Sequence, residues 1–141
     1  RNAKQFPEVV HAQRTYALSA RKDADFAALV FGSIPLYFAP GFELQAKDML
    51  KKIRFGADCY AAVSQHVLNN YSLLPRLHEI KVPTLVLGAG SDLVTPPEYN
   101  REIADLLPDA VYHEVAGAGH FPFFEAPEEC CKMIERWWEK I

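Results

Sequence analysis

The sequence predicts an α/β fold in which a helical region is followed by part of a parallel β-sheet. Residues 1–75 carry apolar side chains at helical spacing. From residue 76 the pattern changes to strand, helix, strand and helix, which is the order of a right-handed parallel crossover. We therefore expect two regions, 1–75 and 76–141, the second of which contributes strands to the sheet.

The first region contains three stretches with helical periodicity, at residues 5–23, 23–31 and 55–71. The last of them is rich in alanine and places Tyr60, Val63 and Val67 on one face. Between the second and third stretches lies GSIPLYFAPGF (32–42), which is interrupted by Gly and Pro and carries several aromatic residues. This segment is expected to be a loop or a helix junction.

The second region begins with VPTLVLGAG (82–90), a short β-branched run that is typical of a buried parallel strand. A helix is expected over 95–107, with Thr95 as N-cap, Pro96 as first helical residue and Glu98 completing a capping box. The apolar face of this helix comprises Tyr99, Ile103, Leu106 and Leu107.

A second strand, AVYHEV (110–115), precedes a helix that is expected to begin at Pro127. The apolar stripe of that helix comprises Cys130, Ile134, Trp137, Trp138 and Ile141. Two parallel strands with two helices cannot cover both faces of their sheet, although parallel sheets are normally buried on both sides. Burial of apolar surface stabilises a fold by about 25 cal/mol per Å², so an uncovered sheet would lose much of this stabilisation. Since the chain also begins at Arg1 rather than Met, we expect an upstream segment or second chain to complete the sheet.

Composition excludes several classes of function. The net charge is −3 and no basic tract is present, which argues against nucleic acid or a membrane surface as partner. No apolar run approaches the roughly 18 residues of a membrane span. The three cysteines have neither disulfide nor zinc-motif spacing, so reduced thiols and a cytoplasmic location are expected. No metal site is expected at His11, His66 or His78, and the glycine-rich stretches match no nucleotide-binding motif, so no cofactor is predicted.

Two ionisable residues follow the two predicted strands. Asp92 comes after the first strand and His120 after the second, 28 residues further on, which is one crossover unit. In open α/β sheets ligands bind beyond the carboxyl ends of the strands, so both loops should meet at the same edge. A carboxylate fixes the tautomer of an imidazole and stabilises its protonated form, as a general base requires.

Structural roles are the alternative for both residues. An Asp after a strand is often a turn or cap residue, but Thr95 is expected to supply the cap here. A single His in a glycine-rich loop is often structural, and His113, inside its strand, is interpreted in that way. The pairing of Asp92 with His120 favours catalysis over these alternatives.

Residues 73–138 resemble the C-terminal third of an α/β-hydrolase, with its last two strands, acid loop and histidine loop. The resemblance implies that Asp92 is the triad acid and His120 the triad histidine, and that residues 1–75 form a helical cap before the core portion 76–141. The family's nucleophile lies in G-x-S-x-G, which this sequence lacks: neither Gly32-Ser33 nor Gly90-Ser91 fits it. An N-terminal segment or chain is therefore expected to carry the nucleophile and the oxyanion hole.

GSIPLYFAP and GHFPFFEAPEE resemble the proline-iminopeptidase-like branch, in which cap acids hold the free amine of the substrate. Glu43 is the acid nearest the aromatic loop, although a solvated glutamate at a helix start is the alternative. The aromatic side chains could equally form the core of the cap. Substrate contacts are expected from Tyr37, Phe38, Phe42, Glu43, Val94 and Phe121.

The predicted function is that of a serine hydrolase acting by acyl transfer on small amide, peptide, ester or lactone substrates. One alternative is an epoxide or haloalkane hydrolase with an Asp nucleophile, and the other is a non-catalytic binding or receptor module. The residue at the nucleophile elbow distinguishes the three hypotheses.

Overall fold

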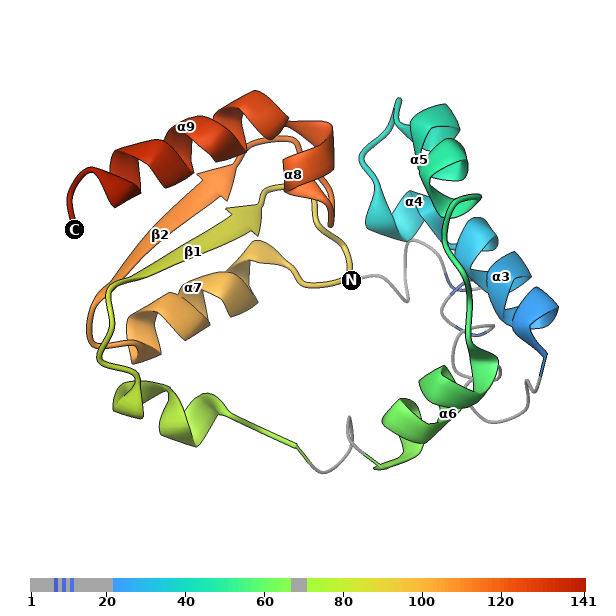
Figure 1. Cartoon of the computed structure of the whole chain (residues 1–141), viewed down its shortest axis with the longest axis horizontal. Helices are drawn as coiled ribbons and strands as arrows, with labels where there is room; N and C mark the ends of the chain where they lie inside the picture. The colour runs from blue at the N-terminus through green and yellow to red at the C-terminus, as the bar shows by residue number, and fades with distance from the viewer. Residues whose placement is uncertain (1–6, 8, 10, 12–21, 67–70) are drawn as a thin grey trace. The chain divides into compact units, whose positions relative to one another are not determined.

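The computed structural model of the chain describes residues 7, 9, 11, 22–66 and 71–141 (Figure 1). These residues divide into two compact units. Unit 1 is formed by residues up to Leu36 and by Pro40–Tyr71, and unit 2 by Tyr37–Ala39 and Ser72–Ile141. Most of the helix expected over 5–23, and residues 67–70 of the one expected over 55–71, lie outside the described residues.

The regular structure described in unit 1 is helical. Its described helices are α3 (Asp23–Gly32), α4 (Ile34–Tyr37, whose last residue belongs to unit 2), α5 (Glu43–Leu50) and α6 (Ala57–His66). The ring of Phe26 in α3 stacks on Tyr60 of α6 with centroids 4.6 Å apart. Asp23 Oδ1 accepts a hydrogen bond from Ala57 N at 2.9 Å, which joins the first residues of these two helices. Helices are thus confirmed over 23–31 and within 55–71, and the expected helix junction contains the short helix α4.

Unit 2 contains the parallel sheet. Its elements are the 3₁₀ helix η1 (Leu74–Glu79), β1 (Thr84–Ala89), α7 (Pro97–Leu106), β2 (Ala110–Val115), α8 (Pro122–Glu125) and α9 (Pro127–Trp138). The strands β1 and β2 pair in parallel, in a register that runs from Thr84 opposite Ala110 to Ala89 opposite Val115. The predicted order of strand, helix, strand and helix is confirmed.

Helices α7 and α9 lie on opposite sides of the two strands (Figure 1). Alternation along β2 distributes its side chains between them, because successive residues of a strand point to opposite faces. The guanidinium of Arg101 in α7 lies over the ring of Tyr112, 5.3 Å from its centroid. On the other face, His113 Nε2 is 3.5 Å from Glu129 Oε1 of α9.

The apolar faces expected on the two helices are only partly covered. Tyr99 of α7 is 58% exposed, and of the stripe expected on α9 only Cys130 is buried, whereas Trp138 is 69% exposed. Ile141 lies beyond the end of α9. Even the apolar residues 85–87 of β1 are only half-buried. A two-stranded sheet is too narrow to bury these surfaces, which agrees with the expectation that the chain forms part of a larger α/β fold.

The best-packed part of unit 2 lies where the strands end. Ala89, Val115, Ala118 and Cys130 form a buried cluster against which Ala126 packs. These residues link the ends of β1 and β2 to the first turn of α9, and they support the loops that carry Asp92 and His120. Within the described part of the chain, no helix is both long enough and apolar enough to cross a membrane.

Candidate active site

The loops that follow β1 and β2 remain hydrogen-bonded to each other beyond the last strand residues. Gly90 N donates to Val115 O at 2.9 Å, and Ser91 N donates to Ala118 O at 2.8 Å. The parallel pairing is thereby extended to the residue before Asp92. Both loops consequently leave the sheet at its carboxyl edge, where ligands bind in open α/β folds.

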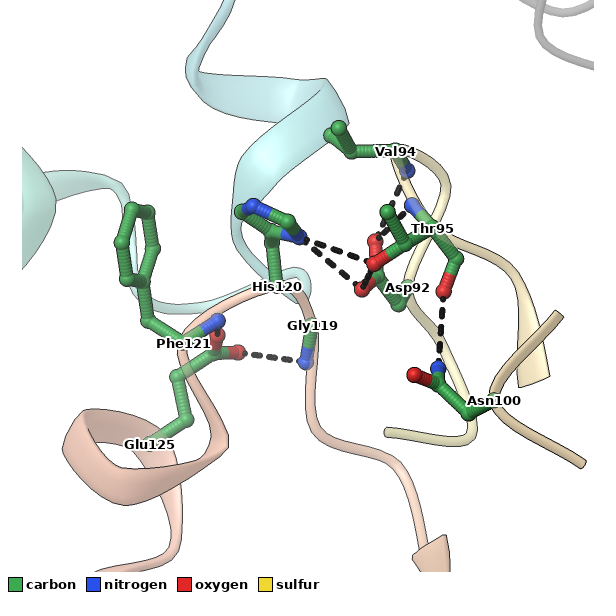
Figure 2. A network of polar contacts seen from close by, with 8 residues as sticks. All are labelled: Asp92, Val94, Thr95, Asn100, Gly119, His120, Phe121 and Glu125. Carbon is green, nitrogen blue, oxygen red and sulfur yellow. Dashed lines mark hydrogen bonds and ion pairs between the residues drawn. The ribbon is translucent and has the colours of Figure 1, made fainter. Parts of the chain in front are cut away.

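Asp92 and His120 lie in direct contact at this edge (Figure 2). His120 Nδ1 is 2.9 Å from Asp92 Oδ2. The side chain of Asp92 is only 5% exposed and that of His120 is 28% exposed, so the acid is buried while the imidazole reaches the surface of unit 2. Because a carboxylate can only accept, the neutral ring carries its proton on Nδ1, and Nε2 is left with its lone pair.

Asp92 also accepts hydrogen bonds from its own loop. Its Oδ1 takes the N–H of Val94 at 2.7 Å and that of Thr95 at 3.0 Å, and its Oδ2 takes the Thr95 hydroxyl at 2.7 Å. Burial is the largest single influence on this carboxyl and raises its pKa, but the hydrogen bonds from His120, Thr95 and Val94 together lower the pKa below its ordinary value. The site therefore favours the ionised carboxylate.

The prediction that Thr95 caps the following helix is wrong. Helix α7 begins at Pro97, its N-cap residue is Pro96, and no side chain caps it. The Thr95 hydroxyl instead donates to Asp92 Oδ2 and lies 3.4 Å from His120 Nδ1. As an N-cap, the Thr95 hydroxyl would accept a hydrogen bond from a backbone N–H, whereas here it donates to a buried carboxylate. Hydrogen bonds to charged groups are about twice as strong as neutral ones. Asp92 is thus a turn residue and a partner of His120 at the same time.

The histidine loop is held by contacts that are distant in sequence. His120 N donates to Tyr37 O at 2.7 Å, and Ala39 N donates to Glu125 Oε2 at 2.8 Å. Gly117 has φ +74°, a left-handed conformation that glycine adopts without strain. It turns the chain after β2 so that His120 faces Asp92.

Aromatic rings surround the imidazole. The rings of Tyr37 and Phe121 each lie 5.3 Å from that of His120 and nearly perpendicular to it. Phe38 is buried and stacks on Phe121 at 4.9 Å. The structure therefore brings Tyr37, Phe38 and Phe121 to the neighbourhood of His120, and their contact with substrate stays a prediction.

The remaining predicted binding residues are placed differently. Val94 is half-buried and its N–H faces Asp92. Phe42 and Glu43 belong to unit 1, and their substrate roles stay predictions. Glu43 is exposed, and hydrogen bonds from its own backbone N–H and from that of Gly41 lower the pKa of its carboxyl.

Other polar residues in the described part of the chain lie in positions that suit a structural role. His113 Nε2 is buried and has no hydrogen-bond partner among the described residues, in keeping with a position inside β2. Ser33 is buried, and its hydroxyl donates to Leu29 O at 2.8 Å within α3. Cys59, Cys130 and Cys131 are free thiols. No group of three or more His, Cys, Asp or Glu residues with the geometry of a metal site occurs among residues that the structure describes.

Two polar residues at this edge were not among the predicted site residues. Thr95 could have been found from its position three residues after Asp92, since an aspartate in a turn commonly accepts hydrogen bonds from the residues that follow it. For Glu125 the sequence gives no signal of its contact with Ala39, which lies 86 residues away. Only the folded chain brings Glu125 and Ala39 together.

Comparison with known proteins agrees with the α/β fold of the chain. A family model described as alpha/beta hydrolase fold matches residues 5–127. The non-heme bromoperoxidase BpoC of Mycobacterium tuberculosis is 49% identical over 55 residues, which are 39% of this chain and 21% of that protein. A proline iminopeptidase of Clostridioides difficile is 33% identical over 70 residues, which are 50% of this chain and 24% of that protein.

Solved structures show the same fold. The crystal structure of the enol-lactonase from Burkholderia xenovorans LB400 matches with a TM-score of 0.70 and 24% identity, covering 94% of this chain and 49% of the lactonase chain. This chain thus spans about half the length of that structure. The proline iminopeptidase similarity also agrees with the expected resemblance to that branch. Because the family model matches residues 5–127, which is most of the chain, the chain belongs to the alpha/beta hydrolase fold family.

Proposed function

We propose that this chain supplies the general base and its orienting acid to a serine hydrolase that acts by acyl transfer. The observation that carries the proposal is the contact of 2.9 Å between His120 Nδ1 and Asp92 Oδ2 at the carboxyl edge of the sheet. Membership of the alpha/beta hydrolase fold family makes hydrolysis the chemistry to test first, although a fold by itself does not fix a function.

In the proposed mechanism, His120 Nε2 takes the proton from a serine hydroxyl as that oxygen attacks the carbonyl carbon of the substrate. Asp92 stabilises the imidazolium that forms, because its buried carboxylate remains ionised. His120 then returns the proton to the leaving group, and an acyl-enzyme remains. Water, deprotonated by the same imidazole, cleaves the acyl-enzyme and releases the acid product.

The serine and the oxyanion hole belong to a segment outside these 141 residues, since no G-x-S-x-G occurs within them. The intact enzyme is therefore this chain together with that segment. The half-buried residues of β1 support this, because a further strand on that sheet would cover them.

Small esters, lactones, amides and short peptides are the proposed substrates. The aromatic rings of Tyr37, Phe38 and Phe121 support an apolar wall beside His120. The relatives are named as an enol-lactonase, a proline iminopeptidase and a non-heme bromoperoxidase, so the first two favour cyclic esters and N-terminal prolyl amides as trial substrates.

The experiment uses the intact enzyme, p-nitrophenyl butyrate as substrate and a fluorophosphonate as serine-directed label. His120→Ala is expected to lower kcat by roughly 10⁴-fold and to slow the labelling in parallel. Labelling with unchanged kcat in His120→Ala would contradict the role of this residue. Turnover without labelling would favour an Asp nucleophile, and binding without turnover would favour a non-catalytic module.

A further inference from the structure

The Glu125 carboxylate accepts backbone N–H groups from both sides of the histidine loop. Its Oε2 takes Ala39 N at 2.8 Å and Gly119 N at 3.0 Å, and its Oε1 lies 3.4 Å from Phe121 N. Gly119 and Phe121 are the immediate neighbours of His120 in the chain (Figure 2). One side chain at the end of α8 therefore fixes the backbone on either side of the imidazole.

The same contacts hold the segment Tyr37–Ala39 against the histidine loop. His120 N donates to Tyr37 O at 2.7 Å, in addition to the bond between Ala39 N and Glu125. The approach is so close that a Cβ atom on Gly119 would lie 2.7 Å from Ala39 N and 2.9 Å from Tyr37 O. Only glycine leaves room for this backbone-to-backbone contact.

The amides that Glu125 binds depend on it for an acceptor. Ala39 and Gly119 are buried, and neither lies within a helix or a strand. A buried N–H without a partner is costly, and a hydrogen bond to a carboxylate is stronger than one to a neutral group. The alternative, an acid that merely complements the N-terminus of α9, would not require a carboxylate directed at three specific amides.

The Glu125 carboxylate also determines what surrounds the imidazole. Tyr37 and Phe121, whose rings pack against His120 at 5.3 Å, are the residues that flank this contact network. Fixing their backbone fixes the two walls between which the imidazole lies. The contact with Asp92 adds the third constraint on the ring.

We propose that Glu125 is a positioning residue that locks the histidine loop onto Tyr37–Ala39 and thereby holds His120 in line with Asp92. The proposal rests on the proposed function in that His120 is taken to be the general base. Because the carboxylate accepts backbone amides, Glu125 acts through His120 and does not touch the reacting atoms.

The direct test is the state of the His120 ring in the intact enzyme, followed by long-range ¹H–¹⁵N NMR. In the wild-type protein His120 is expected to be the Nδ1–H tautomer, fixed by Asp92. In Glu125→Ala the ring should become a mixture of tautomers, whereas Glu128→Gln, a change at an exposed glutamate three residues further along, should leave it unchanged. A folded Glu125→Ala protein with the wild-type tautomer would overturn the proposal.

Kinetics with p-nitrophenyl butyrate supply the second readout, with kcat expressed per active site titrated. Displacing a catalytic group by about 1 Å can cost roughly 100-fold, so Glu125→Ala is expected to lower kcat by about 10- to 100-fold. Glu125→Gln retains one oxygen that can accept Ala39 N and Gly119 N, and should recover most of that loss. A kcat per site equal to wild type in Glu125→Ala would overturn the proposal, since a purely structural residue would reduce only the number of active sites.

A measurement on the wild-type protein decides the matter if the variants do not fold. The amide hydrogens of Ala39 and Gly119 should be protected from exchange, although neither residue belongs to a helix or strand. Exchange of both at the rate of open loop amides would overturn the proposal. If the wild-type enzyme does not hydrolyse the probe, the proposed function fails, while exchange and the ring tautomer still decide whether Glu125 positions His120.

Discussion

The loops that carry Asp92 and His120 follow neighbouring strands of one sheet, but they are stabilised in different ways. Asp92 is held by its own neighbours, the N–H groups of Val94 and Thr95 and the Thr95 hydroxyl. His120 is held by Tyr37, which lies more than 80 residues earlier in the chain, and its loop by the carboxylate of Glu125. Asp92 is therefore placed by a local turn, whereas the placement of His120 also depends on tertiary contacts.

This difference has a consequence for substitutions. A change in the acid loop should remove one or two hydrogen bonds and leave the rest of unit 2 in place. A change in the histidine loop should disturb two segments at once, because Tyr37–Ala39 and the loop share their hydrogen bonds. Substitutions in the two loops should therefore differ in the size and reach of their effects.

Asp92→Asn should have the largest effect on activity. The amide would leave the ring free to adopt the other tautomer, in which Nε2 carries the proton and cannot act as a base. We expect kcat of the intact enzyme to fall by roughly 10⁴-fold, with little loss of folded protein. Steady-state kinetics and thermal unfolding measured together would check this, and a loss of less than about 10-fold would show that Asp92 does not orient the base.

Gly119→Ala should damage the histidine loop through its close backbone contact. The new Cβ would lie 2.7 Å from Ala39 N, so the two segments must separate. We expect a loss of about 1–3 kcal/mol in the free energy of unfolding and a fall in kcat of about 10- to 100-fold.

Gly32→Ala is the matched control, because a Cβ at Gly32 meets nothing within 4 Å. It should leave kcat unchanged and shift the unfolding free energy by no more than about 1 kcal/mol. Equal effects of the two alanine substitutions, measured by urea unfolding and kinetics, would argue against a tightly packed histidine loop.

Thr95→Val should have a smaller, local effect. It removes the hydroxyl that donates to Asp92 Oδ2 at 2.7 Å while keeping the shape of the side chain. A hydrogen bond to a charged group contributes about 1.5–3 kcal/mol to stability. Because His120 and two backbone N–H groups still bind Asp92, only the lower end of that range should reach the barrier, and we expect kcat to fall by about 10-fold. Thr95→Ser keeps the hydroxyl and should behave as wild type, and equal rates for Val and Ser would remove Thr95 from the account.

The lowered pKa of Asp92 predicts a modest dependence of stability on pH. Since its pKa in the folded chain lies below the unfolded value of 3.8, the ionised carboxyl contributes stability above pH 3.8. That contribution is lost as the pH falls through the folded-state pKa. The difference in unfolding free energy between wild type and Asp92→Asn should therefore shrink as the pH falls below the unfolded value of 3.8. Denaturant titrations at a series of pH values would test this, and a difference that grows on acidification would contradict it.

The two loops also differ in how far the sequence predicts them. Strand periodicity and a spacing of 28 residues were enough to place Asp92 beside His120, because parallel strands bring successive loops to one edge. The same reasoning assigned Thr95 to the following helix, since capping preferences consider only the backbone and not a neighbouring carboxylate. The contact between Glu125 and the segment Tyr37–Ala39 could not be predicted from the sequence, because it spans 86 residues and has no periodic signal.

The helix faces show a related limit. The apolar periodicity correctly predicted the helices α7 and α9, but it does not reveal which of their surfaces are covered. Tyr99 and Trp138 are exposed in the described structure, although their spacing is that of buried residues. An amphipathic pattern indicates that one face of a helix packs against an apolar surface. The two-stranded sheet is too small to provide that surface.

The most direct test of the account is a double-variant cycle on the intact enzyme, comparing kcat for His120→Ala, Asp92→Asn and the combination. If Asp92 acts only by orienting His120, removing the imidazole already removes its contribution, so the double variant should be no slower than His120→Ala alone. If the two residues acted independently, their fold-losses in kcat would multiply. A double variant slower than His120→Ala by the full factor lost in Asp92→Asn would contradict an orienting role for Asp92.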